Sequence, residues 1–174
     1  MTQIDPEVEA IEKEDRLHPI HVETDYLGRF KSVSRIRDLP GVYIDEPKSL
    51  GGENSGPTAL ETALAALNAC SAMIIYIMAR ELKFAYQDLH FSATGVVDAR
   101  RVEMKRSRLK YSEVKPVAEH YQSVEQTVTL VTAEPPERVD ELRSEVHRLC
   151  PMHALLRDAG VPVEAKWVVV APDD

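Results

Sequence analysis

The sequence predicts an α+β fold with a largely antiparallel sheet. Three observations lead to this prediction: a long apolar helix pattern near the middle of the chain, strand patterns on both sides of it, and two shorter helix patterns before a final strand. A chain of 174 residues is long enough to bury a real core as one domain. We therefore expect a single domain over residues 21–174, preceded by an N-terminal arm or short helix at residues 1–20.

Strand patterns come first along the chain. From His21 the sequence HVETDYLGRFKSVSRIR predicts a hairpin that turns at Gly28. Residues 39–41, Leu-Pro-Gly, mark a second turn, and residues 42–44 predict a short strand. This part of the chain therefore predicts antiparallel pairing.

A loop rich in glycine and proline follows at residues 45–57. Its glycine pair, Gly51 and Gly52, is not followed by the Gly-Lys-Ser/Thr sequence of a phosphate-binding loop, so the segment does not predict a nucleotide site. We expect Asp45 and Glu46 to cap or brace this loop.

Residues 57–83 hold the longest apolar run in the chain. Thr58 and Glu61 fit a capping box at its start. Residues 62–79 are apolar on nearly every side, which predicts one long helix buried in a core. The run approaches the roughly 20 apolar residues that cross a membrane, but Asn68 and many small alanines favour packing against protein.

Strand and helix patterns continue to the end of the chain, and helical spacing of apolar residues distinguishes the two kinds. Proline at a helix start and glycine just past a helix end supply the expected boundaries. In chain order we expect two strands within 87–111 with a bend near Asp98, a strand at 124–132, a helix from 135 to about 150, a short helix from Pro151 to Gly160, and a strand at 163–171.

Charge and composition exclude several classes of partner. The net charge is −8, which disfavours nucleic acid and anionic membrane surfaces. A basic stretch at residues 100–110 alternates with apolar residues and is expected to be a solvated strand face. The acidic N-terminus has no apolar signal-peptide core, so we expect a cytoplasmic protein.

The two cysteines have contrasting surroundings in the sequence. Cys70 lies in the apolar helix, where a thiol is often an inert core residue. Cys150 directly precedes Pro151, so it is expected at the N-cap of a helix, where free backbone N–H groups favour a thiolate. In a reducing compartment a cysteine pair is more often catalytic, redox-active or metal-binding than structural.

A zinc site is the alternative use of these cysteines. His147, Cys150 and His153 are spaced three residues apart, and Cys70 could supply a fourth ligand. Pro151 interrupts the helical face that would align them, so we expect no metal, but the spacing alone leaves the alternative open.

Two motifs together resemble a known family. The run DEPKSLGGENSGPTALETALAALNAC, followed some 80 residues later by CPMHALL, resembles the OsmC/Ohr family of bacterial proteins, in its broad OsmC-like branch. The resemblance extends from about Val22 to Ala171. It implies an OsmC-like fold in which antiparallel sheets wrap around long central helices in an intertwined homodimer. It also implies an antioxidant peroxidase that reduces organic hydroperoxides or hydrogen peroxide, uses thiols or lipoylated proteins as reductants, and needs no cofactor.

The resemblance assigns roles by position. Cys70 matches the peroxidatic cysteine, which attacks the peroxide, and Cys150 matches the resolving cysteine. Arg29 is the best match for the arginine that holds the reactive thiolate, and Arg35 and Arg37 compete for that role.

Glu61 matches the glutamate that opens the family's helix, although this chain has Ala59 where the family often has proline. Glu61 lies nine residues before Cys70, roughly half a helical rotation away, so a straight helix points the two side chains apart and a capping role for Glu61 is equally consistent. The apolar wall expected to bind the substrate's alkyl tail consists of Leu67, Met73 and Ile74.

Two functions therefore remain open. One is a peroxidase in which a Cys70 sulfenate is resolved by Cys150. The other is an OsmC-like fold that binds a hydrophobic ligand or a metal with little or no peroxidase activity.

Overall fold

The computed structural model describes residues 17, 19–98, 110, 113 and 120–172 of the chain. The predicted N-terminal arm or helix, the second strand after Asp98 and most of the basic stretch fall outside these residues. The chain forms two compact units, Met1–Ala59 and Leu60–Asp174, and each is described by itself.

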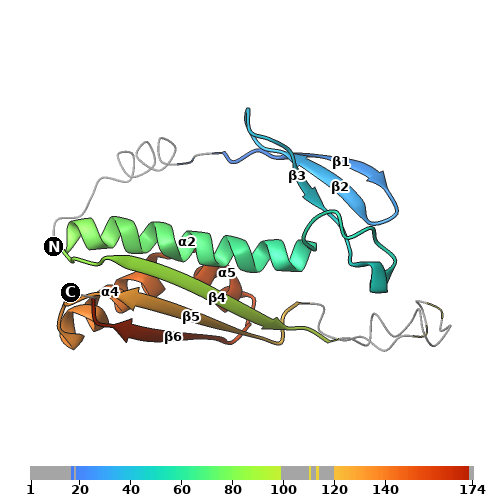
Figure 1. Ribbon diagram of the computed structural model, residues 1–174. Helices are drawn as coiled ribbons and strands as arrows, with labels where there is room; N and C mark the ends of the chain where they lie inside the picture. Colours follow the sequence, from blue (N-terminus) through green and yellow to red (C-terminus); the bar gives the residue numbers. More distant parts are fainter. Residues whose placement is uncertain (1–16, 18, 99–109, 111–112, 114–119, 173–174) are drawn as a thin grey trace, which may run out of the picture. The chain divides into compact units, whose positions relative to one another are not determined.

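The first unit contains a three-stranded antiparallel sheet (Figure 1). Its strands are β1 (Glu23–Gly28), β2 (Lys31–Arg35) and β3 (Val42–Ile44), paired in that order, and a short 3-10 helix, η1 (Lys48–Leu50), follows. Gly28 has φ of 106°, a conformation that favours glycine, where the first hairpin turns. The predicted hairpin and short third strand are confirmed.

The loop after β3 is organised around the side chain of Asp45. Its carboxylate accepts hydrogen bonds from the backbone N–H groups of Glu46, Glu53 and Ser55. A Cβ atom at Gly52 would collide with the backbone of Glu46, so the close approach of the two loop segments requires glycine there. The prediction that Asp45 braces this loop is confirmed.

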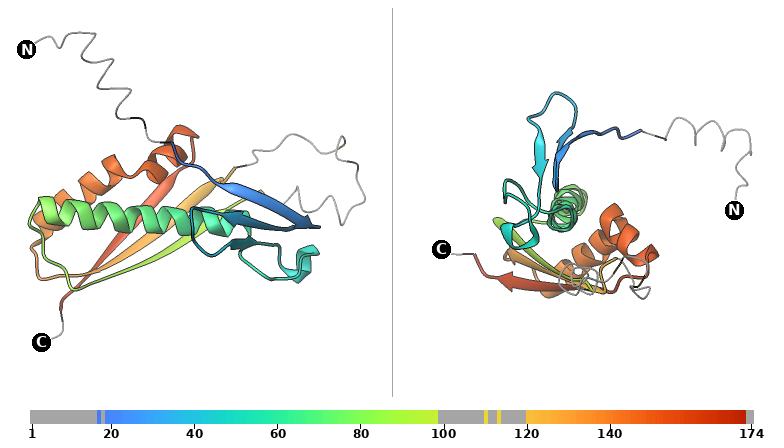
Figure 2. Two further views of the ribbon diagram at one scale, coloured as in Figure 1. Left: turned by 90° about the horizontal axis from the view of Figure 1, so that it is seen from above. Right: turned by 90° about the vertical axis from the view of Figure 1, so that its right-hand side faces the viewer.

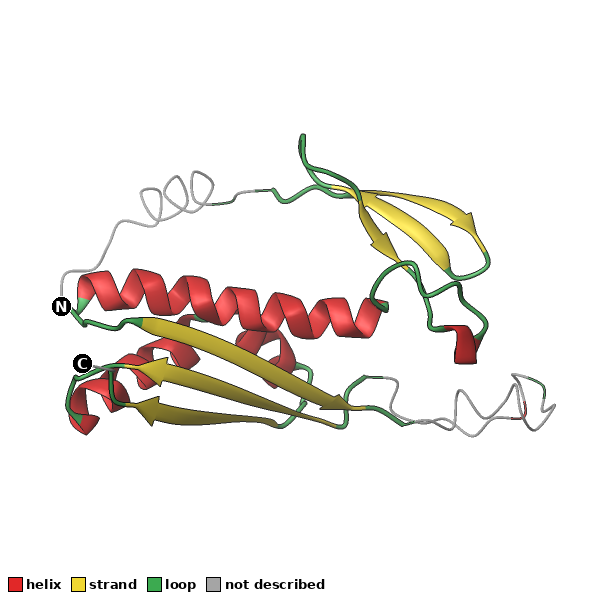
Figure 3. Cartoon of the chain, viewed as in Figure 1, coloured by secondary structure: helices red, strands yellow, loops and turns green. Residues whose placement is uncertain are grey.

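The second unit contains a mixed three-stranded sheet (Figure 3). Strand β4 (Asp88–Val96) pairs antiparallel with β5 (Ser123–Val131), and β5 pairs parallel with β6 (Val163–Val170). The largely antiparallel pairing expected from the sequence is therefore observed for β1–β2, β2–β3 and β4–β5, and the pairing of β5 with β6 is a parallel exception. Two helices separate these strands in the chain, and such a crossover returns the chain in the same direction.

Three helices, α2 (Ala59–Glu81), α4 (Pro136–Leu149) and α5 (Pro151–Asp158), cover one face of this sheet (Figure 2). The helix bounds agree with the ends predicted from the capping, proline and glycine residues. Helix α2 begins at Ala59, which places Thr58 at the N-cap position, and Gly160, with φ of 75°, follows the end of α5. The helices and strands predicted from 124 to 171 are all confirmed.

Helix α2 is buried along one stripe only. Met73, Tyr76 and Ile77 are 53%, 54% and 49% exposed, so within the described chain the predicted core burial holds for one stripe of the helix. By length and composition α2 is apolar enough to cross a membrane, with mean hydropathy of 1.8 in its most apolar window. Its buried stripe nevertheless packs on protein, because it belongs to the cores shared with the sheet. The buried stripe consists of Leu67, Ser71, Ile75 and Ala79.

Two apolar clusters lie between the helices and the sheet. One contains Ile75 and Val128, and the other contains Leu67 and Val124. Ser71 is the buried residue between Leu67 and Ile75 on α2, and Gln126 is its counterpart between Val124 and Val128 on β5. Ser71 and Gln126 thus form a buried polar layer between the two apolar clusters. Trp167 packs against the first cluster.

Candidate functional site: a buried thiol pair

The fold brings the two cysteines together although they are 80 positions apart in the chain. The Sγ atoms of Cys70 and Cys150 are 3.2 Å apart, and both are free thiols. Because a disulfide bond is about 2 Å long, the sulfurs need to approach by only about 1 Å to form one. Cys150 is fully buried, whereas Cys70 is partly exposed. The more accessible thiol is therefore the one predicted to meet the peroxide.

The junction between α4 and α5 places Cys150. Helix α4 ends at Leu149 and α5 begins at Pro151, and Cys150 between them is extended, with φ of −72° and ψ of 114°, at the predicted N-cap position of α5. Its side chain makes no capping hydrogen bond. Pro151 has no N–H group to offer, and the N–H of Met152 instead bonds the sulfur of Cys70. The expected donor at the helix start thus serves the other cysteine.

The pKa of the Cys70 thiol is raised above its ordinary value. Burial is the main cause, the Met152 N–H group acts in the opposite direction, and the neighbouring Cys150 raises the pKa further. No positively charged side chain of the described second unit is among these influences. Since the thiolate is the nucleophilic form, Cys70 needs a cation from elsewhere to react quickly at neutral pH.

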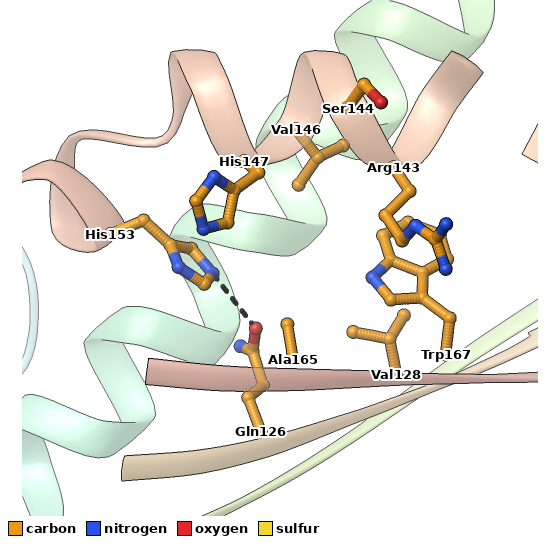
Figure 4. Close-up of a pocket in the computed structure, with 9 residues that line it drawn as sticks. All are labelled: Gln126, Val128, Arg143, Ser144, Val146, His147, His153, Ala165 and Trp167. Atoms are coloured by element: carbon orange, nitrogen blue, oxygen red, sulfur yellow. Dashed lines mark hydrogen bonds between the residues drawn. The ribbon is translucent and has the colours of Figure 1, made fainter. Parts of the chain in front are cut away.

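A hydrogen-bonded polar layer leads away from the thiol pair. Gln126 Nε2 donates to Asn68 Oδ1 at 2.9 Å and to Ser71 Oγ at 3.2 Å. His153 Nε2 lies 3.1 Å from Gln126 Oε1, shown as the dashed line in Figure 4. Ser71 Oγ lies 3.9 Å from Cys150 Sγ. The layer therefore connects a buried histidine on α5 to the buried cysteine.

Sequence reasoning missed the functional potential of Ser71 and Gln126. Gln126 stands on the otherwise apolar buried side of β5, and Ser71 on the buried stripe of α2. The sequence signal for these two residues was a polar side chain at a position that strand alternation or helical spacing predicts to be buried. The pattern does not reveal the partner, because the partners come from other elements.

A cavity of about 430 Å³ adjoins this layer between α4, α5 and strands β5 and β6. Figure 4 shows His147 and His153 at one end of it and Arg143 beside Trp167 at the other. The rings of His147 and His153 are 5.3 Å apart. Within the described part of the chain, no three His, Cys, Asp or Glu side chains are grouped so that they could hold a metal ion. The zinc alternative therefore gains no support from the geometry.

The three residues predicted as an apolar wall have different positions on α2. Leu67 is fully buried in the cluster with Val124, and Ile74 packs against the cluster with Ile75. Met73 is 53% exposed. The second unit by itself does not gather the three around the sulfur of Cys70, and their part in binding substrate stays a prediction.

Glu61 lies in the first turn of α2. The Tyr121 hydroxyl donates to the Leu60 carbonyl at 2.5 Å, and burial and then the negative charge of Glu61 raise the pKa of Tyr121. The structure thus gives Glu61 an electrostatic neighbour at the helix start, and its catalytic role stays a prediction.

The arginines predicted to activate Cys70 all belong to the first unit. Arg29 lies in the β1–β2 turn with φ of 52° and borders a cavity of about 450 Å³. Arg35 is paired with Asp25 on the neighbouring strand, and Arg37 has φ of 53° in the next turn. Because Cys70 belongs to the second unit, the choice among these arginines stays a prediction.

Comparisons with known proteins place the chain among OsmC-like proteins. The sequence matches the family described as OsmC-like protein over residues 52–166. A structure of an OsmC-like protein from Mycoplasma pneumoniae is similar with a TM-score of 0.71 and 14% identity, over 88% of this chain and 98% of that one. An organic hydroperoxide resistance protein OsmC from Legionella pneumophila gives a TM-score of 0.65 and 18% identity, over 88% and 98% of the two chains.

A third structure is that of an organic hydroperoxide resistance protein from Elizabethkingia anophelis with thiocyanate bound. It gives a TM-score of 0.62 and 16% identity, over 88% of this chain and 98% of that one. At these identities the structural likeness shows the fold alone. A comparison with curated protein sequences gives no match.

Proposed function

This chain belongs to the OsmC-like family, and from that premise we propose that it is a thiol-dependent peroxidase that reduces organic hydroperoxides. The observation that carries the proposal is the 3.2 Å separation between the sulfurs of Cys70 and Cys150. Two free thiols at this distance, one partly exposed and one buried, are arranged for one to react with a substrate and the other to close a disulfide.

The reaction needs two steps at the sulfurs. In the first, the Cys70 thiolate attacks the terminal oxygen of the hydroperoxide, an S–O bond forms, the O–O bond breaks, and the leaving alkoxide takes a proton to become the alcohol. In the second, Cys150 attacks the sulfenic sulfur, an S–S bond forms, and the hydroxyl group leaves as water. Two thiol groups of a reductant, a small thiol or a lipoylated protein, then reduce the disulfide.

A positive charge beside Cys70 favours the thiolate that the first step needs, since burial raises the pKa of its thiol. Arg29 is proposed to supply it, because a guanidinium stays charged and offers several donors to both thiolate and peroxide. Glu61 is proposed to orient that guanidinium. The apolar side chains Met73 and Ile74, with Leu67 behind them, are proposed to favour an alkyl hydroperoxide over hydrogen peroxide.

The exposed face of α2 supports a homodimer. Met73, Tyr76 and Ile77 are each about half exposed on a helix whose other face is buried, and a second copy of the chain would cover them. Sedimentation velocity should show a dimer that Ile77→Lys dissociates and that Glu164→Lys, on the polar outer face of the sheet, leaves intact. A monomeric wild-type protein would contradict this proposal.

The main experiment follows both cysteines after one equivalent of cumene hydroperoxide. Non-reducing peptide mapping should find a Cys70–Cys150 disulfide, and stopped-flow measurement should show a sulfenate that precedes it. Replacing the nucleophile, Cys70→Ser, should reduce the rate of peroxide consumption by at least about 10³-fold. The matched variant Cys150→Ser should consume one equivalent and stop.

Two outcomes would contradict the proposal. One is a Cys70 that stays reduced, which would favour the ligand-binding alternative for this fold. The other is over-oxidised Cys70 in the wild type beside an unreacted Cys150, which would mean that Cys150 does not resolve the sulfenate.

A further inference from the structure

The donors and acceptors of the polar layer beside the thiol pair can be assigned atom by atom. Gln126 Oε1 accepts from His153 Nε2, and Gln126 Nε2 donates to Ser71 Oγ. Ser71 then has one hydroxyl hydrogen to give. Gln126 Oε1 at 3.5 Å is one acceptor for it, and Cys150 Sγ at 3.9 Å, whose own hydrogen is donated to Cys70 Sγ, is the other. Hydrogen bonds thus link His153 through Gln126 to Ser71, whose hydroxyl lies next to the buried sulfur.

The protonation state of His153 fits its role as the donor to Gln126. Its side chain is 97% buried, since its residual exposure is 3%, and among the described residues its Nδ1 is a buried side-chain atom without a hydrogen-bond partner. Burial, then the charges of His147 and Arg157, lower the pKa of His153, so the ring is neutral. A neutral ring that donates from Nε2 carries a lone pair on Nδ1, which costs less to leave unpaired than a charged N–H group would.

We propose that Ser71, Gln126 and His153 are positioning residues for Cys150, and that the Ser71 hydroxyl stabilises the Cys150 thiolate that closes the disulfide. This inference rests on the proposed peroxidase function. Cys150 must lose its proton before it attacks Cys70, yet it is fully buried and lacks a capping hydrogen bond. A contact of 3.9 Å is long for a neutral thiol, and a thiolate would draw the hydroxyl closer.

The proposal separates the two steps of the reaction. The attack of Cys70 on the hydroperoxide does not involve Ser71, so its rate should be unaffected by the layer. The closing step forms the S–S bond, breaks the S–O bond, and joins the departing hydroxyl to the proton released by Cys150 to give water. This second step should depend on each member of the layer.

Ser71→Ala is the most direct test. Stopped-flow kinetics with cumene hydroperoxide should show sulfenate formation within about twofold of wild type and disulfide closure about tenfold slower, the loss expected for one hydrogen bond to a charged group. Sulfinic acid at Cys70 should accumulate in the variant, because the sulfenate waits longer for its partner. Ser144→Ala, which removes an exposed helical hydroxyl outside the layer, is the matched control and should behave as wild type.

Variants of His153 test the far end of the layer. His153→Leu removes the donor to Gln126 and should slow closure about threefold, whereas His153→Gln keeps a donor at the same reach and should restore it. A purely structural role would slow both steps or neither, and Gln would not differ from Leu.

Oxidation by diamide distinguishes this inference from the proposed function. Cys70 adds to the azo group to form an S–N bond, and Cys150 then displaces the reduced hydrazine as the S–S bond forms, so closure is measured without peroxide. If hydroperoxide fails to oxidise wild-type Cys70 while Ser71→Ala still slows diamide closure, the peroxidase proposal fails and the positioning role stands. Closure at the wild-type rate in Ser71→Ala with both oxidants would overturn the positioning role. If Ser71→Ala does not fold, equal closure rates in His153→Leu and wild type would overturn it instead.

Discussion

Asp45 in the first unit and Cys70 in the second are ionisable groups removed from water in opposite ways. The Asp45 carboxylate accepts three backbone N–H groups and the Ser55 hydroxyl, and these bonds, led by the Ser55 N–H, lower its pKa to about 2. The Cys70 thiol has one backbone donor, from Met152, and burial raises its pKa. The loop around Asp45 supplies hydrogen-bond donors to both oxygens of its carboxylate, whereas a Cys70 thiolate would have one backbone donor.

The difference shows which of the two sites is complete. Four donors hold Asp45 charged at any physiological pH, so its charge organises a loop and has nothing left to bind. Cys70 is reactive only as an anion, and the second unit supplies too little stabilisation for that form. A second group that stabilises the thiolate is therefore expected beside Cys70 if this thiol is to act.

The largest effect is expected from removing the proposed cation. Arg29→Ala should lower the rate of sulfenate formation at neutral pH by about 100-fold, because the thiol would remain protonated and the peroxide would lose a donor. Stopped-flow kinetics measures this rate. Arg35→Ala, which removes a guanidinium already paired with Asp25, is the matched control and should change the rate less than about threefold.

Raising the pH should partly rescue the Arg29 variant. A thiol with a raised pKa becomes thiolate as the pH rises. The rate of sulfenate formation should therefore increase about tenfold per pH unit until the pH passes that pKa. In wild type the same increase should occur at lower pH. A large loss in Arg37→Ala together with a wild-type profile in Arg29→Ala would transfer the role to Arg37.

Much of the fold was predictable because its signals are local. The helix expected at 57–83 is Ala59–Glu81, and the strand expected at 124–132 is Ser123–Val131. Proline at helix starts, glycine after helix ends and the alternation of apolar residues depend only on near neighbours in the chain. The pairing of Cys70 with Cys150 came from the family resemblance, since no local pattern joins residues so far apart.

The rest depended on contacts that no local pattern contains. Parallel pairing of β5 with β6 follows from where the crossover helices pack, and alternation alone does not distinguish parallel from antiparallel pairing. The helix-start N–H expected to serve Cys150 bonds Cys70 instead, because α2 brings that sulfur to the start of α5. Likewise, Gln126 could be recognised as a buried polar residue, but Ser71 and His153 could not be recognised as its partners.

A smaller effect, on stability rather than rate, is expected at Asp45. Because its pKa is lower in the folded state, its charge stabilises the fold above the unfolded pKa of about 4, and this contribution is lost as the pH falls toward about 2. The urea midpoint of wild type should therefore fall over that range, while that of Asp45→Asn should be lower throughout and change less. Amide exchange at Ser55 should be faster in the variant, and Asp38→Asn, at an exposed turn, should match wild type.

The smallest effect is expected from Glu61→Gln. If Glu61 acts only by orienting Arg29, its loss should reduce sulfenate formation roughly fivefold, far less than the loss of the guanidinium itself. The same substitution should lower the pKa of Tyr121, because it removes the negative charge that disfavours the phenolate. Ultraviolet titration of tyrosine measures that shift, and Glu81→Gln at the other end of α2 should leave it unchanged. A rate loss as large as that of Arg29→Ala would show that Glu61 contacts the reacting atoms, and an unchanged rate with a shifted Tyr121 would limit Glu61 to the helix start.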